Sequence, residues 1–214
     1  LLYTGLAKGK CHAEDSAYYI ASFLSPAEEA ATLARVYSAP RPKWTQLAHR
    51  RLQNWGGVPT AKGMVAEQLP AWLSALASRV AELGAFGTHL PNHVLVNEYS
   101  SGQGILAHLD GPVFHPVIAT VSLGSTTVLR FKDNVSLLLE PRSLLLLRDR
   151  LYTNHMHYIE EVTEDRIDDS IANLDLCEGK YKVGSTLPRG TRVSLTIRHV
   201  PKTTTFKINI GNKR

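Results

Sequence analysis

The feature of this sequence that most restricts its fold is a series of short β-type runs that begins near Asn92. These runs are rich in branched apolar residues and are separated by turns that contain Gly, Pro, Asp or Asn. We expect strands at 94–99, 117–123, 126–131, 136–140, 143–148, 154–160 and 192–200. Many short strands with tight turns are typical of a sandwich, a barrel or a jelly roll.

The N-terminal part has helical spacing instead. Ser25-Pro26 followed by an acidic and then apolar sequence predicts a helix from Pro26 to Tyr37, stopped by the prolines beyond it. A second helix is expected from Pro70 to about Leu83, with Gly84 at its end. The segment between the helices is expected to be loop-rich, and 161–188 to be a long irregular insertion or mobile loop. The fold class is therefore mainly β with N-terminal helices (α+β).

Length and composition favour one globular domain spanning residues 1–214. The 43% of hydrophobic residues can form a substantial core. No apolar run is long enough to cross a membrane, and Leu1 to Lys10 lack the apolar stretch of a signal peptide, so we expect a soluble monomer. Cys11 and Cys177, the two cysteines, suggest a reducing compartment. The chain does not begin with methionine, so its natural N-terminus need not be included.

A basic and aromatic stretch lies in the N-terminal part. The chain has a net charge of +5 and a pI near 9.3, which favours partners that carry phosphate. Bases stack on aromatic rings while phosphates pair with arginine, so this composition favours nucleic acid. The alternative is a solvated surface above two buried indoles. The stretch comprises Arg35, Tyr37, Arg41, Lys43, Trp44, Arg50, Arg51 and Trp55.

A pair of metal-ligand residues follows a glycine-rich turn at 100–104. His108 and Asp110 are two apart, so in an extended segment they point to the same side. His157 on a separate strand could complete a set of two histidines and one carboxylate, which leaves open coordination positions on Fe(II). His155 competes with it, because the two would share one face of the expected strand.

The C-terminal strand carries two arginines at even spacing. Arg192 and Arg198 share one face with Ser194 and Thr196. A guanidinium group binds a carboxylate through two parallel hydrogen bonds, so this face suits a dicarboxylate. Six residues of straight strand span ~20 Å, so both arginines could contact one small ligand only if the strand bends or the side chains converge. The alternative is an exposed, solvated face.

Taken together, these residues resemble a known family. Asn97-x-Tyr99, His108-x-Asp110, His157 and Arg192-x5-Arg198 occur in the order and approximate spacing of the AlkB-type Fe(II)/2-oxoglutarate-dependent dioxygenases. The resemblance covers roughly residues 20 to 201 and is closest to the branch called AlkB homologue six. It rests further on RRLQNWGG (50–57), NHVLVNEY (92–99), HLDGP (108–112), SLGS (122–125), LLLEPRSLL (137–145) and RGTRVSLTIR (189–198).

The resemblance implies a double-stranded β-helix, a cupin-like jelly roll, at 89–214. Residues 1–88 would give helical support and a nucleotide-recognition lid with Trp44, Arg50, Arg51 and Trp55 as its substrate-binding candidates. His108, Asp110 and His157 would hold iron. Arg192, with Tyr99, would bind the distal carboxylate of 2-oxoglutarate. Arg198 and Asn97 would bind its other end. Ser194 stands where several relatives carry asparagine.

The implied activity is oxidative decarboxylation of 2-oxoglutarate to succinate, coupled to hydroxylation of an N-methyl group on a base in DNA or RNA. The base would have to be single-stranded or flipped. The alternatives are a nucleic-acid-binding protein with little turnover and an oxygenase that acts on a protein. A cytoplasmic and nuclear location is expected.

Two features depart from the family. Gly111 and Pro112 follow the metal-binding aspartate where repair enzymes carry an acidic residue, so their base recognition cannot be transferred. The short link from Phe131 to Ser136 replaces longer insertions in this branch, which leaves the shape of the substrate cleft open.

Overall fold

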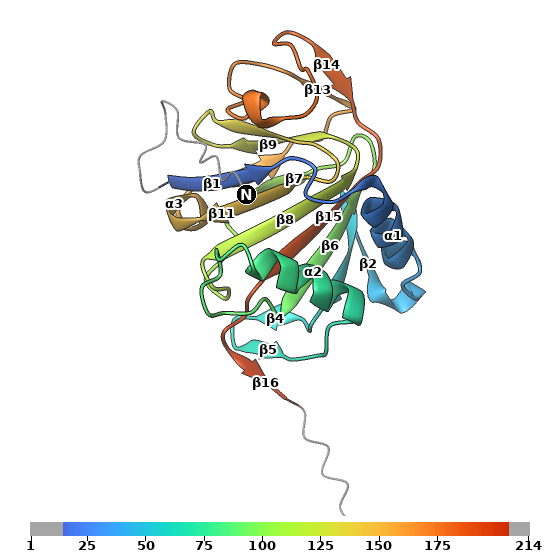
Figure 1. The fold of residues 1–214 in the computed structure, drawn as a ribbon, viewed down its shortest axis with the longest axis vertical. Helices are drawn as coiled ribbons and strands as arrows, with labels where there is room; N and C mark the ends of the chain where they lie inside the picture. Colours follow the sequence, from blue (N-terminus) through green and yellow to red (C-terminus); the bar gives the residue numbers. More distant parts are fainter. Residues whose placement is uncertain (1–14, 206–214) are drawn as a thin grey trace, which may run out of the picture.

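The computed structural model describes residues 15–205, and its centre is a large antiparallel sheet (Figure 1). Each strand is paired with its spatial neighbour over most of its length. In spatial order, the seven strands are β1 (Asp15–Ile20), β11 (Leu144–Arg148), β8 (Val117–Gly124), β15 (Arg192–Arg198), β6 (His93–Tyr99), β3 (Arg50–Trp55) and β2 (Trp44–Leu47).

A second sheet faces the first and closes the interior. Its strands, in spatial order, are β10 (Ser136–Leu139), β9 (Thr127–Phe131), β12 (His157–Ile159) and β7 (Ile105–His108). Apolar side chains from both sheets form one buried cluster, which includes Tyr99, Leu129, Leu139, Leu145 and Ile159. Two facing antiparallel sheets with this cluster form a jelly roll, so the expected fold class is confirmed.

Short strands extend the two ends of the molecule (Figure 1). At one end β13 (Glu164–Arg166) pairs with β14 (Thr186–Pro188). At the other end β4 (Pro59–Thr60), β5 (Gly63–Val65) and β16 (Thr203–Thr204) form a small three-stranded sheet.

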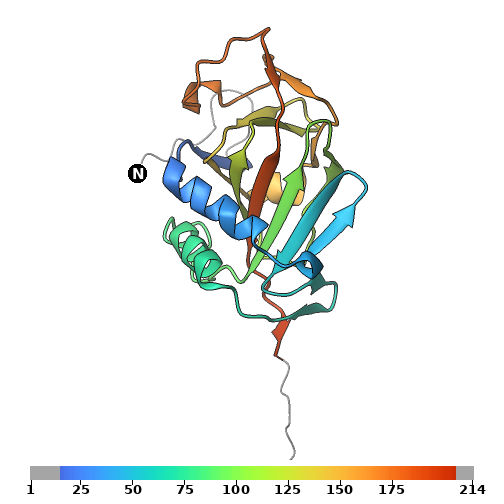
Figure 2. The same ribbon diagram turned by 90° about the vertical axis from the view of Figure 1, so that its right-hand side faces the viewer.

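Two helices cover the outer face of the large sheet (Figure 2). Helix α1 (Pro26–Tyr37) begins at Ser25, whose side chain forms a reciprocal capping box with Glu28, as the sequence predicts. Helix α2 (Ala71–Ala81) ends two residues earlier than expected. Its buried face, with Leu73, Leu76 and Val80, packs against the same cluster as Val36 of α1.

Strand β11 shows how one leucine run serves both sides of the sheet. Leu144 and Leu146 pack under the helices, whereas Leu145 and Leu147 point into the space between the sheets. All four are almost fully buried, and the alternation follows from the two-residue period of a strand. The strand therefore forms the shared wall between the two cores.

The prediction of a loop-rich segment between the helices is wrong for residues 44–47 and 50–55, which form strands. After a 3-10 turn (η1, Arg41–Lys43), β2 and β3 form a hairpin, and β3 pairs with β6 from Arg51 to Trp55. The first 88 residues thus supply β1, β2 and β3 to the large sheet as well as both long helices. Residue 88 does not separate helical support from the β-structure.

The expected strand at 154–160 is shorter than predicted. Only His157–Ile159 pair as β12, and a short helix, α3 (Asp149–Thr153), precedes them. The run of leucines in β11 ends at Arg148, after which Asp149 takes a positive φ of 55° that ends the strand.

The segment 161–188 has more structure than the irregular insertion that the sequence predicts. It contains β13, β14 and a 3-10 turn (η2, Leu174–Leu176), and its Ile167 and Ile171 are buried against Val128 and Leu138. Its apolar residues are too sparse to show a period, which hid this cluster from the sequence prediction.

Two buried carboxylates attach this segment to the sheets. Asp165 pairs with both Nε and Nη2 of Arg189 at 2.6 Å and accepts a hydrogen bond from the backbone N–H of Val128 in β9 at 3.2 Å. Glu140 accepts hydrogen bonds from the Tyr19 and Tyr181 hydroxyl groups and from two backbone N–H groups of the segment. Such charge-assisted contacts fix its position.

Within residues 15–205, no helix has the length and apolar character needed to span a membrane. Cys11 and the stretch Leu1 to Lys10 lie outside the described residues.

Candidate metal centre and cosubstrate pocket

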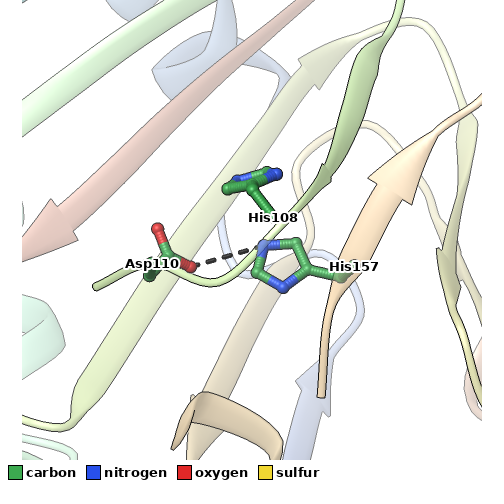
Figure 3. A group of neighbouring side chains, drawn as sticks. All are labelled: His108, Asp110 and His157. Atoms are coloured by element: carbon green, nitrogen blue, oxygen red, sulfur yellow. Dashed lines mark ion pairs between the residues drawn. The ribbon is translucent and has the colours of Figure 1, made fainter. Parts of the chain in front are cut away.

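Three side chains gather where the second sheet opens. His108 ends β7, Asp110 follows in the adjoining loop, and His157 begins β12 directly opposite His108 in the strand register (Figure 3). One ligand atom from each residue lies within 4.8 Å of the others. The structure thus brings together the three residues that the sequence predicts as iron ligands.

The surroundings of both histidines suit metal binding. Nδ1 of His108 lies 2.9 Å from the Leu106 carbonyl oxygen, to which it donates, so Nε2 is the nitrogen that can face a metal. Burial lowers the pKa of His157, although Asp110 opposes this shift. Two imidazoles and a carboxylate form the facial set typical of non-haem Fe(II).

Asp110 is held from two sides. Its Oδ1 accepts a hydrogen bond from Nη2 of Arg198 at 2.5 Å, and its Oδ2 lies 3.3 Å from Nε2 of His157. Gly111 follows with a φ of +81°, which glycine adopts easily, and its carbonyl accepts a hydrogen bond from the Tyr152 hydroxyl at 2.5 Å. Helix α3 therefore braces the turn after the carboxylate.

His155 does not compete for the metal. It lies before β12 rather than in it, so it does not share a strand face with His157, and its Nδ1 pairs with Asp133. The expectation that a strand places both histidines on one face is wrong, because regular pairing starts at His157.

A cavity of about 240 Å³ runs from the metal ligands into the space between the sheets. Leucines from β9, β10 and β11 form much of its apolar wall. All of the residues expected to bind 2-oxoglutarate line it, namely Asn97, Tyr99, Arg192, Ser194 and Arg198.

Arg192 is a buried cation that has no counter-ion among residues 15–205. Its Nη2 donates to the Ser122 hydroxyl at 2.9 Å, while its Nε has no partner, and among residues 15–205 it forms no ion pair. Burial lowers its pKa to about 10. Because an unpaired buried charge is costly, this group fits an anionic ligand such as the distal carboxylate of a dicarboxylic acid.

Arg198 lies at the metal end of the same strand face. Its guanidinium group binds Asp110 and stacks 4.5 Å from the centre of the Phe114 ring. The two arginines therefore mark opposite ends of the cavity, as the six-residue spacing along β15 requires. Arg198 orients a metal ligand, a role that the sequence does not reveal.

The expected lid residues do not gather at one surface. Arg50 lines the cavity, and its Nε donates to Oδ1 of Asn97 at 3.1 Å. Trp44, Arg51 and Trp55 lie on the helix-covered side of the large sheet, where Arg51 stacks on Trp44 and Trp55 meets Trp72 edge-on. Grouping all four residues in one lid is therefore wrong, since neighbouring residues of a strand face opposite ways.

Three polar residues of the site carry no clear signal in the sequence. Ser122 contacts Arg192, Tyr152 braces the turn after Asp110, and Thr127 lies at the distal end of the cavity. The inward face of β8 could have revealed Ser122, because it is an even number of residues from Ile118 and Thr120.

Fold and site together define an iron-dependent oxygenase that uses a 2-oxo dicarboxylic acid. The chain belongs to the 2OG-Fe(II) oxygenase superfamily, whose family pattern matches residues 42–198. Members use Fe(II) and 2-oxoglutarate, and both fit the groups described above: two imidazoles with a carboxylate for the metal, and a buried guanidinium without a counter-ion among residues 15–205 for the cosubstrate.

Relatives support this assignment. The chain is 46% identical to the zebrafish (Danio rerio) "Probable RNA/DNA demethylase ALKBH6" over 94% of its own length and 92% of the relative, which confirms the expected branch. It is 26% identical to the Arabidopsis thaliana "Alkylated DNA repair protein ALKBH8 homolog" over 72% of its length and 53% of the relative.

Solved structures share the fold at low identity. OsALKBH1 superimposes with a TM-score of 0.60 at 13% identity, covering 88% of this chain and 99% of the other. A Pseudomonas putida prolyl-4-hydroxylase gives 0.53 at 17% identity, covering 87% and 92%.

Proposed function

We propose that this protein oxidatively demethylates an N-methylated base in single-stranded or locally opened DNA or RNA. The observation that carries the proposal is one cavity with the metal triad at its mouth and the unpaired Arg192 at its far end. For such a substrate we expect a nuclear and cytoplasmic location.

The chain's own residues prepare the reaction. Bound Fe(II), with 2-oxoglutarate and dioxygen, supplies the oxidation of a C–H bond and yields succinate and carbon dioxide. His108, Asp110 and His157 would hold the iron, and Arg192 would orient the cosubstrate along the cavity. The leucine wall excludes water from the reacting centre.

A hollow of about 350 Å³ lies beside the metal ligand His108 and supports our proposal that a nucleic-acid strand approaches the site there. It shares Arg50, Ile105 and His108 with the main cavity. At its rim, Nδ1 of His49 in the β2–β3 turn lies 3.1 Å from Glu161. Arg50 offers a phosphate contact there, because its hydrogen bond to Asn97 uses Nε and leaves the terminal nitrogens to face a ligand.

Exposed leucines flank the metal ligand at this mouth. Leu106 is 79% exposed and Leu109 is 43% exposed, on either side of His108. Apolar side chains at a cavity mouth can contact the face of an extruded base. The name of the zebrafish relative adds independent support for a nucleic-acid substrate.

The test is anaerobic reconstitution with Fe(II), followed by 2-oxoglutarate turnover with panels of methylated oligonucleotides and methylated peptides. We expect succinate and formaldehyde only with N-methylated, single-stranded or mismatched oligonucleotides. An Asp110→Ala protein is the matched control for background oxidation.

Two results would contradict the proposal. Turnover that depends on peptides alone would indicate a protein-modifying oxygenase. Salt-dependent binding of oligonucleotides without turnover in iron-loaded protein would indicate a nucleic-acid-binding protein.

A further inference from the structure

A small void closes the far end of the cosubstrate cavity. Its volume is about 10 Å³, and its wall includes Tyr99, Thr127, Arg189 and Arg192. Such a volume is about that of one water-sized atom. The void therefore has room for a carboxylate oxygen but not for a longer carbon chain.

Thr127 points into this end of the cavity. It begins β9, and its side chain shares the inner face with Leu129 and Phe131, which pack between the sheets. The residue is 2% exposed, and its hydroxyl oxygen has no hydrogen-bond partner among the described residues. An unpaired buried hydroxyl is unfavourable unless a ligand satisfies it.

A second donor at the same void is also unpaired. Nε of Arg192 has no partner, whereas neighbouring Arg189 is fully occupied by Asp165 and by the Glu160 carbonyl. Arg189 is thus neutralised, and Arg192 alone remains to attract a carboxylate. Two unpaired donors and no unpaired acid indicate that an anion completes this end of the cavity.

We propose that Thr127 binds the cosubstrate: its hydroxyl donates to the distal carboxylate of 2-oxoglutarate, beside the guanidinium group of Arg192. A carboxylate has about four acceptor positions, so it can take the arginine fork and the hydroxyl together. With the Arg189–Asp165 pair behind it, Thr127 also limits the length of the 2-oxo acid. The inference rests on family membership and not on the identity of the methylated substrate.

The first test compares Thr127→Val with Thr127→Ser in the full-length, metal-loaded protein without oxygen. Titration calorimetry should show 2-oxoglutarate binding about 10-fold or more weaker in Thr127→Val, as expected for a lost hydrogen bond to a charged group. Thr127→Ser should retain binding within about 3-fold. Thr45→Val, on the exposed side of strand β2, is the matched control.

The unfolding of the cosubstrate-free protein separates binding from structural support. Replacing an unpaired buried hydroxyl by a methyl group removes a polar cost, so Thr127→Val should unfold at an equal or higher denaturant concentration than the wild type. A purely structural threonine would give the opposite shift. Lower stability with unchanged 2-oxoglutarate affinity would overturn the proposal.

The length limit gives a further readout. Thr127→Ala should reduce the preference for 2-oxoglutarate over 2-oxoadipate, which is one methylene longer, in the same binding assay. An unchanged preference would contradict the limiting role. If the wild-type protein binds 2-oxoglutarate but does not oxidise oligonucleotides, only the proposed substrate is overturned. The 2-oxoglutarate affinities of the Thr127 variants would still test whether Thr127 binds the cosubstrate.

Discussion

Arg50 and Arg51 are neighbours in strand β3, yet their side chains lie on opposite faces of the large sheet. Arg50 reaches into the cosubstrate cavity and donates to Asn97, whereas Arg51 forms a two-pronged contact with Glu98 at 2.6 and 2.9 Å. Asn97 and Glu98 are themselves neighbours in β6, so the two pairs show the alternation of both strands.

Single substitutions of these arginines should have different effects. Arg50→Ala should weaken binding of single-stranded nucleic acid and lower its salt slope by ~0.7, the value for one phosphate contact. Arg51→Ala should leave the slope unchanged and lower the free energy of unfolding by about 1 kcal/mol or less, because its pair is partly solvated. Affinity measured against salt, with chemical denaturation, checks both. Equal salt slopes in the two variants would contradict the separation.

Loss of one iron ligand should abolish stoichiometric Fe(II) binding while the chain stays folded. His108→Ala and Asp110→Ala each remove one of three protein ligands from an open site. His155→Ala is the matched control, since its ring pairs with Asp133. Metal content after anaerobic loading, with circular dichroism, tests the assignment. Wild-type iron content in Asp110→Ala would refute it.

Arg192→Ala should weaken 2-oxoglutarate binding by about 2 to 5 kcal/mol, because it removes the buried charge opposite the carboxylate. Iron content should be unaffected, since Arg192 contacts Ser122 rather than a metal ligand. Calorimetric titration of the iron-loaded variant, without oxygen, is the measurement. An affinity equal to that of the wild type would exclude Arg192 as the carboxylate anchor.

Tyr152→Phe should reduce Fe(II) affinity by roughly 10-fold, toward the lower end of effects seen for residues that orient metal ligands. The substitution keeps the ring but removes the hydroxyl that donates to the Gly111 carbonyl. Competition with a metal chelator measures the change. Tyr158→Phe, on strand β12, is a suitable comparison and should keep the wild-type affinity.

His93 should make folding less favourable in acid. Burial, reinforced by nearby Arg198, lowers its pKa from 6.5 to about 3. Between these values the unfolded chain binds a proton that the folded chain does not, so stability falls as pH decreases from 6.5 toward 3 and is fully present above 6.5. His93→Asn should remove up to ~1.4 kcal/mol per pH unit of this slope. Denaturation of both proteins at several pH values tests the difference.

Helices and strands whose side chains repeat with a regular period along the sequence were predictable. The even spacing of Arg192 and Arg198 placed both on one face of β15, which the structure shows to be the inner face, and Ser25-Pro26 marked the start of α1. Both signals depend on backbone geometry alone, which local sequence determines.

The parts that depend on tertiary pairing were not predictable. Strand β3 is rich in charged and amide side chains, and it is a strand because β6 lies beside it. Thr127 carries no local signal either, since its importance arises from Arg192, which is 65 residues away in the chain and beside it in the cavity wall. Strand propensity depends strongly on such surroundings.

The register of β7 and β12 implies that a bound metal ion would stabilise the pairing of these two strands. His108 and His157 face each other across two strands, and within residues 15–205 the edge strand β7 pairs with β12 alone. An ion bound to both histidines and to Asp110 would cross-link β7 to β12. Local unfolding of β7 would then require release of the ion. Because a slip of one residue would turn a histidine to the other face, the ion would also lock the strands in register.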